Sequence, residues 1–263
     1  MIEAALDLGI RAIDTSFNYR GFASHTTLAR VAGDLLPKFE VSTKIGFLPG
    51  PGKHSLSPVP LWKALGRTLQ DLEHVPDVVF LHNPERTLAR LPPDRQPEVL
   101  ATAFAVLSEA VDLGMCRRWG VASWNPERLP DLPTGSGLVP QVLMVPAGLL
   151  VGAQTLEAAD SLTKRWHEPT MWGMSPFGGS FEDPIWDRVD PRIFLRSEAQ
   201  ECSRAQAALR VAYCLPEVRR VAVGSDDPTH LRELVNALDC SVDEAKIRRY
   251  RCLLRERGGN QRP

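Results

Sequence analysis

The strongest constraint on the fold is an alternation along the chain. Short apolar runs rich in β-forming residues alternate with longer segments whose apolar residues recur at helical spacing. This pattern predicts repeated strand–helix units and a mostly parallel sheet. The expected strands lie at residues 11–14, 40–44, 77–82, 119–123, 141–145, 170–174 and 220–224. The expected helices lie at residues 26–36, 60–73, 97–113, 154–166, 198–215 and 228–238.

Two parallel architectures fit this pattern, the open doubly wound sheet and the closed (β/α)8 barrel. The doubly wound sheet usually carries a G-x-G-x-x-G motif after its first strand, and this chain has none. Its length of 263 residues fits a barrel, which needs about 250. We therefore expect an α/β chain with the (β/α)8 TIM barrel fold, in which residues 1–263 form a single domain.

The two ends of the chain differ from a plain barrel. Residues 3–8 read as the end of a helix that leads through Gly9 into the first recognisable strand, so the first of eight barrel strands is expected to be missing. Three explanations are open: the chain starts inside its first helix, translation starts upstream, or another segment closes the barrel. Residues 241–257 read as an added C-terminal helix, with Ser241 and Glu244 as a capping box.

Composition excludes several classes of protein. No apolar run approaches the ~20 residues of a membrane span, and the net charge of -1 gives no basic field for nucleic acid. The N-terminus lacks the features of a signal peptide. The five cysteines contain no C-x-x-C pair, so neither a disulfide framework nor a metal site is expected, and a cytoplasmic location is favoured.

Polar side chains end three consecutive predicted strands. Asp14 ends the first, Lys44 the second and His82 the third, while Tyr19 follows Asp14 by five residues. The carboxyl ends of barrel strands form the active site, so these four side chains are expected to face one mouth. A tyrosine hydroxyl ordinarily titrates near pH 10 and needs help to give up its proton. A lysine cation supplies that help, an aspartate holds the lysine, and an imidazole orients a carbonyl oxygen.

The segments that carry these residues resemble the aldo-keto reductases. They read DLGIRAIDTSFNY, STKIG, DVVFLHNPE and DLGMCRRWGVASWNPE, in the family's order and at similar spacing over nearly the whole chain. The resemblance implies a (β/α)8 barrel that here lacks the usual N-terminal hairpin and first strand. It implies reduction of a small carbonyl compound by hydride transfer from NAD(P)H, with Asp14, Tyr19, Lys44 and His82 as the catalytic tetrad and Tyr19 as proton donor.

Cofactor contacts are also implied by the resemblance. Ser123 and Gln141 match positions that hold the nicotinamide carboxamide, and Ser175 matches a pyrophosphate contact. The segment VAVGSDDPTHLRELV matches the region that grips the adenosine phosphate, with backbone donors at Gly224 and Ser225, and with Arg232 as the side chain available for a 2′-phosphate. NADP is the expected cofactor, and NAD is the alternative because Asp226 and Asp227 repel such a phosphate.

A second interpretation stands beside the enzyme. The missing first strand, and Met174 where many members stack an aromatic ring, favour a catalytically impaired reductase-like barrel that acts as a binding or regulatory subunit. The intact tetrad favours the enzyme. Two long connections, at residues 82–97 and 175–196, are candidates for functional loops, and the aromatic residues of the second either line a substrate pocket or pack their own loop.

Overall fold

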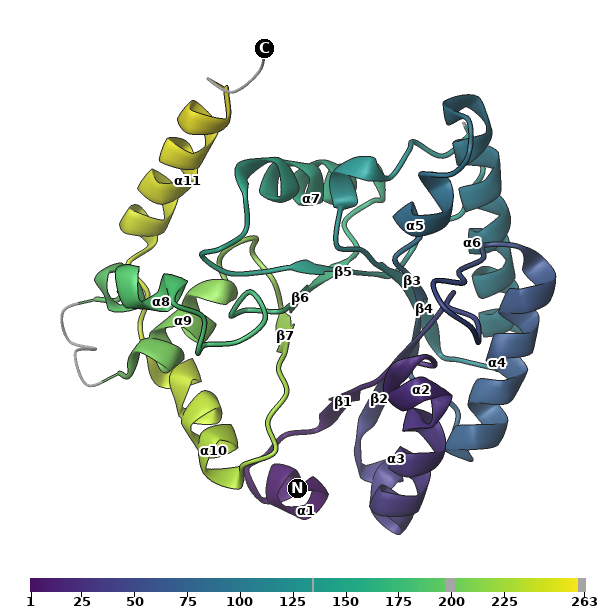
Figure 1. The fold of residues 1–263 in the computed structure, drawn as a ribbon, viewed down its shortest axis with the longest axis horizontal. Coiled ribbons are helices and arrows are strands. Elements are labelled where there is room, and N and C mark those ends of the chain that lie inside the picture. Colours follow the sequence, from purple (N-terminus) through teal and green to yellow (C-terminus); the bar gives the residue numbers. More distant parts are fainter. Residues whose placement is uncertain (134, 197–201, 260–263) are drawn as a thin grey trace. The chain divides into compact units, whose positions relative to one another are not determined.

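The structure, a computed structural model, describes residues 1–133, 135–196 and 202–259 (Figure 1). Seven strands lie within these residues: β1 (Ala12–Asp14), β2 (Glu40–Ile45), β3 (Val78–His82), β4 (Arg118–Ala122), β5 (Val142–Pro146), β6 (Thr170–Met174) and β7 (Arg220–Ala222). Each predicted strand is present, with ends that shift by at most two residues. The alternation in the sequence was therefore sufficient to locate them.

The strands follow one another in the sheet in chain order, from β1 to β7. Parallel pairing joins β1 to β2, β2 to β3, β3 to β4, β4 to β5, and β6 to β7. A doubly wound sheet reverses its strand order at a switch point, whereas a (β/α)8 barrel keeps the order of the chain. The prediction of the (β/α)8 fold class is confirmed, with seven strands in the described part of the chain.

Helices and 3-10 turns connect the strands. The α-helices are α1 (Ile2–Asp7), α2 (Tyr19–Phe22), α3 (Ser24–Ala32), α4 (Pro58–Leu72), α5 (Glu85–Leu88), α6 (Gln96–Asp112), α7 (Ala153–Arg165), α8 (Ile185–Arg188), α9 (Arg204–Ala212), α10 (Pro228–Asn236) and α11 (Glu244–Gly259). The 3-10 helices are η1 (Gly33–Lys38), η2 (Pro93–Arg95), η3 (Pro126–Arg128), η4 (Pro191–Phe194) and η6 (Ala237–Asp239). Within the described ranges, none of the helices has both the length and the apolarity that crossing a bilayer requires.

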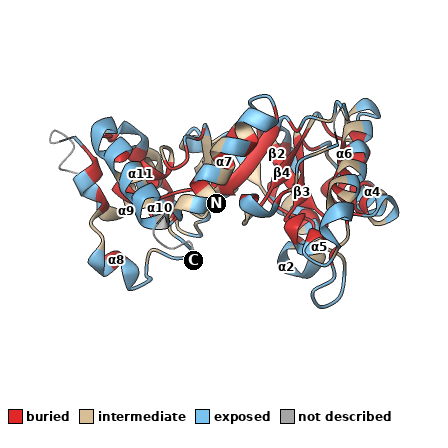
Figure 2. Cartoon of the chain, turned by 90° about the horizontal axis from the view of Figure 1, so that it is seen from above, coloured by how far each residue is buried: buried red, intermediate tan, exposed pale blue. Residues whose placement is uncertain are grey.

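The described chain divides into two compact units. The N-terminal unit comprises Ile2–Met144 with Trp166–Pro169. The C-terminal unit comprises Met1, Val145–Arg165 and Thr170–Pro263 as far as that segment is described. In the N-terminal unit, α4 and α6 cover β2, β3 and β4 (Figure 1). The strands there are buried while the outer faces of these helices are exposed (Figure 2).

Three predicted helices have different limits in the structure. The helix predicted at 26–36 ends at Ala32 and continues as η1, because Gly33 adopts a positive φ of 49° and Pro37 removes a backbone donor. Of the helix predicted at 198–215, residues 198–201 lie outside the described residues, and α9 begins only at Arg204 because Ser203 caps it by accepting the N–H of Gln206. The predicted capping box of Ser241 and Glu244 is wrong. The Asp243 carboxylate accepts the backbone N–H groups of Ala245 and Lys246 instead, so α11 begins at Glu244.

The added C-terminal helix packs on the C-terminal unit. Ile247 of α11 is buried in its apolar cluster, and the Tyr250 hydroxyl donates to the carbonyl of Leu149 at 2.8 Å. Arg251 forms an ion pair with Asp160 of α7 at 2.5 Å. An apolar contact, a hydrogen bond and an ion pair therefore attach α11 to the rest of the C-terminal unit.

One pair of cysteines departs from the expectation of no disulfide framework. Cys202 and Cys240, 38 residues apart, form a disulfide within the C-terminal unit. Their separation in the sequence gave no motif that could reveal the pairing. Cys116, Cys214 and Cys252 are free thiols.

A buried histidine makes the stability of the N-terminal unit depend on pH. His25 of α3 is only 1% exposed, and its Nε2 lies 2.7 Å from Thr43 Oγ1 on β2. Burial lowers the pKa of His25 from 6.5 to about 4, against a smaller opposing effect of the Asp71 charge. Between these two values the unfolded chain binds a proton that the folded chain does not, so stability falls as the pH falls through this window.

We predict that His25→Leu flattens this dependence. From pH 7 to pH 5 the wild type should lose about 2 kcal/mol more unfolding free energy than the variant, because a shift of one pKa unit corresponds to ~1.4 kcal/mol. Urea denaturation at each pH measures both slopes, with the partly exposed His74→Leu as the matched control. Equal slopes in wild type and His25→Leu would refute the assignment.

Candidate active site

The carboxyl ends of β1, β2 and β3 bring the predicted tetrad together in the N-terminal unit. Asp14 is the last residue of β1, His82 is the last residue of β3, and Lys44 is the penultimate residue of β2. Tyr19 opens α2 just after β1. Parallel pairing with matched register places these strand ends at the same edge of the sheet.

The centre of the site is a buried ion pair between neighbouring strands. The Lys44 ammonium is only 3% exposed and donates a short hydrogen bond to the Asp14 carboxylate. It also donates to the carbonyl of Thr15 at 2.9 Å, and the Ser42 hydroxyl donates to the other Asp14 oxygen at 2.7 Å. A buried charge is tolerated when it is paired and its remaining hydrogen-bonding capacity is used. The Asp14 carboxylate therefore fixes the position of the Lys44 positive charge at the strand ends.

The tyrosine lies over that charge. Lys44 Nζ is 5.3 Å from the centre of the Tyr19 ring, and the ring meets His82 edge to face with centroids 6.2 Å apart. Tyr19 is 43% exposed, in contrast to the buried Lys44 and His82. Positive φ angles at Arg20 and Phe22 turn the chain directly after it. The phenol is thus accessible from outside while the groups that act on it are enclosed.

His82 is buried and uncharged near neutral pH. Burial is the largest cause that lowers its pKa to about 3, followed by the positive charge of Lys44 and then by His54 and Arg86. Its Nδ1 lies 3.0 Å from the hydroxyl of Ser16, in the turn after β1. A neutral imidazole beside a lysine and a tyrosine is suited to hydrogen bonding with a carbonyl oxygen rather than to carrying charge.

A buried carboxylate that sequence reasoning missed opens α5, three residues after the end of β3. Glu85 is 5% exposed and accepts hydrogen bonds from the Ser123 hydroxyl at 3.0 Å and from the backbone N–H groups of Trp124 and Asn125 at 3.0 and 3.3 Å. It therefore fixes the turn after β4 that carries Ser123. The available signal was its place in the HNPE segment directly after β3.

The structure does not bring Gln141 to these residues. Gln141 is exposed and precedes β5, and its side-chain oxygen accepts the backbone N–H of Trp119 near the start of β4 at 2.9 Å. It therefore lies at the amino ends of the strands, whereas Asp14, Lys44 and Ser123 lie at their carboxyl ends. The resemblance matched the residue type, but the place of Gln141 before β5 separates it from the carboxyl ends of the strands.

The other predicted cofactor residues belong to the C-terminal unit. Ser175 follows β6 with a positive φ of 53°, and Arg232 lies exposed on α10. The loop of Gly224 and Ser225 follows β7, and the Ser225 hydroxyl accepts the N–H of Asp227 at 3.2 Å. The Asp227 carboxylate caps α10 by accepting the N–H of Thr229 at 2.7 Å. The N-terminus of α10 is thus already capped by Asp227, a carboxylate of the chain itself.

The aromatic residues of the long connection after β6 contact one another. Phe177 meets Phe181 with ring centroids 5.6 Å apart, and Phe181 meets Trp186 at 4.9 Å. Trp186 is 2% exposed and donates its indole N–H to the Phe177 carbonyl. Of the two interpretations of these rings, the packing of their own loop agrees with these contacts.

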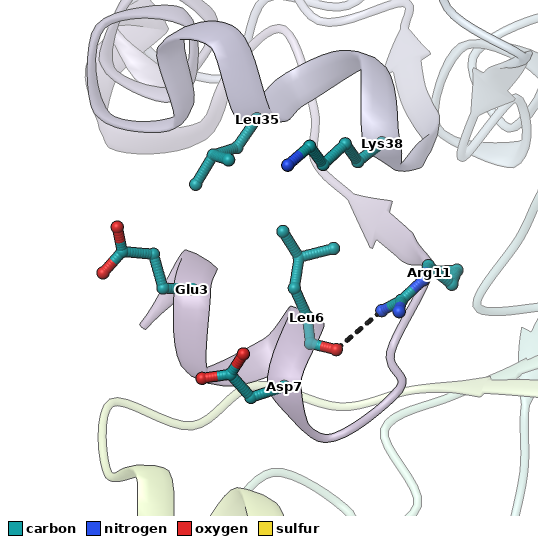
Figure 3. A pocket seen from close by; sticks show the side chains of 6 residues that line it. All are labelled: Glu3, Leu6, Asp7, Arg11, Leu35 and Lys38. Carbon is teal, nitrogen blue, oxygen red and sulfur yellow. Dashed lines mark hydrogen bonds between the residues drawn. The ribbon is translucent and has the colours of Figure 1, made fainter.

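Two surface pockets lie at the opposite end of the N-terminal unit from the tetrad. One lies between α1 and η1, where Glu3, Leu6 and Asp7 face Leu35 and Lys38, and where Arg11 donates to the Leu6 carbonyl (Figure 3). The other is lined by residues at the amino ends of β2 and β4. Neither contains a tetrad residue. Among the residues that the structure describes, no group of three or more His, Cys, Asp or Glu side chains is arranged to hold a metal.

Comparisons with known proteins agree with this fold. The model of the Aldo/keto reductase family matches residues 1–160, which include the whole tetrad. No curated protein matches the chain.

Solved structures show the same fold at low sequence identity. An aldo-keto reductase from Bacillus halodurans in its holo form is 17% identical with a TM-score of 0.71, over 96% of this chain and 85% of that chain. An aldo-keto reductase from Klebsiella pneumoniae in complex with NADPH is 16% identical with a TM-score of 0.69, over 96% and 82%. One from Brucella melitensis is 19% identical with a TM-score of 0.65, over 96% and 88%. The chain belongs to the aldo/keto reductase family.

We predict that Glu85→Gln destabilises the protein. The amide keeps one oxygen for the two backbone N–H groups and turns a donor toward the Ser123 hydroxyl, but it removes the negative charge that these donors stabilise. Hydrogen bonds to a charged group are worth about 1.5–3 kcal/mol each, against about 0.5–1.5 kcal/mol for neutral ones. The expected loss of unfolding free energy is about 3 kcal/mol, measured by urea denaturation. Glu98→Gln, at a side chain 70% exposed, is the control and should change stability by less than about 0.5 kcal/mol. A loss as small as that of the control would contradict the anchoring role.

Proposed function

We propose that the protein is an oxidoreductase that reduces an aldehyde or ketone to an alcohol with NADPH. The observation that carries this proposal is the arrangement of Asp14, Lys44, Tyr19 and His82 at adjoining strand ends, with the tyrosine exposed above an enclosed cation. Membership of the family supports the reaction class.

The chain's own contribution is the movement of one proton. Tyr19 Oη gives its proton to the carbonyl oxygen as that oxygen gains negative charge. The ammonium of Lys44 stabilises the phenolate that remains, because it lies 5.3 Å from the ring centre in a buried environment where charges interact strongly. Asp14 keeps the ammonium in this place, so its role is to position Lys44.

His82 orients the carbonyl oxygen. A neutral imidazole donates from Nε2 only when Nδ1 carries no proton. In the productive state the Ser16 hydroxyl, 3.0 Å from Nδ1, donates to Nδ1 instead of to Asn18 Oδ1, its other acceptor at 2.7 Å. A hydrogen bond from Nε2 and the proton of Tyr19 then converge on the same oxygen. Both interactions strengthen as negative charge develops on that oxygen, which is the condition for lowering the barrier.

The nicotinamide end of the cofactor fits the residues at these strand ends. Asn83, between His82 and the Glu85 anchor, is 8% exposed, and its side-chain oxygen is buried without a hydrogen-bond partner among the described residues. Ser123 donates to Glu85 and keeps acceptor capacity on its oxygen. Acceptors of this kind suit the N–H groups of a carboxamide, so Ser123 and Asn83 would hold it. When bound, NADPH supplies the hydride for the carbonyl carbon.

The charges of the chain near the proposed site of the adenosine phosphate leave a choice between NADPH and NADH. Neighbouring structures bind NADPH, or NADP with acetate, which supports NADPH here. Ser175, Gly224, Ser225 and Arg232 remain our candidates for its phosphates. The carboxylates of Asp226 and Asp227 oppose a 2′-phosphate, so NADH is the alternative.

We predict that Tyr19→Phe abolishes aldehyde-dependent NADPH oxidation while the affinity for NADPH stays within about threefold of wild type. The substitution removes the proton donor and keeps the ring. Loss of a general acid typically costs about 10²–10⁴ in rate. Absorbance at 340 nm with a panel of aldehydes gives the activity, and tryptophan fluorescence quenching gives the affinity.

Substantial activity in Tyr19→Phe would refute the role of the tyrosine. A wild type that binds NADPH and turns over no carbonyl compound would refute the enzyme and support the binding or regulatory subunit. Tyr213→Phe, outside the N-terminal unit, is the matched control and should retain activity.

A further inference from the structure

A second histidine lies directly behind His82. His54, in the loop between β2 and α4, is 9% exposed. Its Nε2 lies 2.7 Å from the carbonyl oxygen of His82, and its Nδ1 lies 2.7 Å from Thr87 Oγ1 on α5. The side chain therefore links the backbone of the last β3 residue to the helix that follows it.

The two partners of His54 determine its protonation. A carbonyl oxygen only accepts hydrogen bonds, so Nε2 must carry the proton. In a neutral ring Nδ1 is then an acceptor, and the Thr87 hydroxyl donates to it. Burial is the largest cause that lowers the pKa of His54, which keeps the ring neutral near pH 7. Both ring nitrogens are satisfied in this one tautomer.

The local backbone leaves room for this contact. Gly46, directly after β2, has a φ of 137°, and a Cβ there would lie 2.8 Å from His54 Nε2 and 3.2 Å from the His82 oxygen. Only glycine permits so close an approach.

The next residue in the loop adds a contact to the ring of His82. Phe47 bridges to His54 across the loop and meets both histidine rings edge to face, at 4.9 Å from His54 and 4.8 Å from His82. The loop thus contacts the backbone of His82 through His54 and its imidazole through Phe47.

We propose that His54 is a positioning residue that sets the orientation of His82 through the His82 carbonyl, with Thr87 holding the His54 ring in place by donating to its Nδ1. This role rests on the proposed function of His82 as the group that orients the substrate carbonyl. His54 touches neither substrate nor cofactor in this account.

Three variants separate positioning from general stability. His54→Leu removes the donor to the His82 carbonyl, whereas His54→Gln retains an N–H group at a comparable distance from the backbone. Thr87→Val keeps the shape of the side chain but removes the hydroxyl, so Nδ1 of His54 loses its donor and the ring is held only through Nε2. His74→Leu, at the amino end of the sheet, is the control.

In the kinetic measurement, we expect His54→Leu and Thr87→Val to lower kcat by roughly 10- to 100-fold, because displacement of a catalytic group by about 1 Å costs this much. The KM for NADPH should stay unchanged in both, and His54→Gln should keep most of the wild-type kcat. A wild-type kcat in both His54→Leu and Thr87→Val would overturn the proposal.

Imidazole ¹⁵N NMR tests the same claim without any turnover. In the wild type we expect His54 as the Nε2–H tautomer, and in Thr87→Val a shifted Nδ1 signal, because its hydrogen bond is lost, together with displaced His82 signals. His54 in the Nδ1–H form in the wild type, or unchanged His82 signals in folded His54→Leu or Thr87→Val, would overturn the positioning role. If the wild type reduces no carbonyl compound, the proposed function fails while this measurement still decides whether His54 holds His82.

Discussion

The buried ion pair between Asp14 and Lys44 is the interaction on which the site depends. Removing an ammonium from water is costly, and the cost is met here by the carboxylate and by the carbonyl of Thr15. The pair joins the ends of β1 and β2, which are neighbours in the sheet. It also places a positive charge under the Tyr19 ring and beside His82, where that charge helps to keep the imidazole neutral.

A second set of buried polar groups supports the site by hydrogen bonding to residues at the strand ends or in the turns after them. Ser42 holds Asp14, Ser16 contacts His82, and Glu85 holds the turn that carries Ser123. Each is enclosed and hydrogen-bonded, as buried polar groups must be if they are not to destabilise the fold. Their common effect is to reduce the freedom of the side chains that face the substrate, so that less order has to be created when a carbonyl compound binds.

Much of this could be predicted from the sequence, because strand ends in a parallel sheet converge and the residues that end β1, β2 and β3 can be read directly. What was missed depends on contacts between distant segments. The hydrogen-bond donors to Glu85 come from the turn after β4. His54 contacts His82 because the loop that carries it follows a path that depends on the backbone of Gly46. The Ser241 cap failed because Asp243 competes two residues later. Gln141 opens its strand, as expected, and there it binds the backbone near the start of β4, away from the tetrad.

The most direct test of the account is the transfer of an isotope. NADPH carrying deuterium at the transferable C4 position is incubated with the protein and a panel of aldehydes, and the alcohol products are analysed by mass spectrometry and NMR. The account predicts one deuterium on the carbinol carbon in a reaction that requires Tyr19. Binding of NADPH without any deuterium in an alcohol would contradict it.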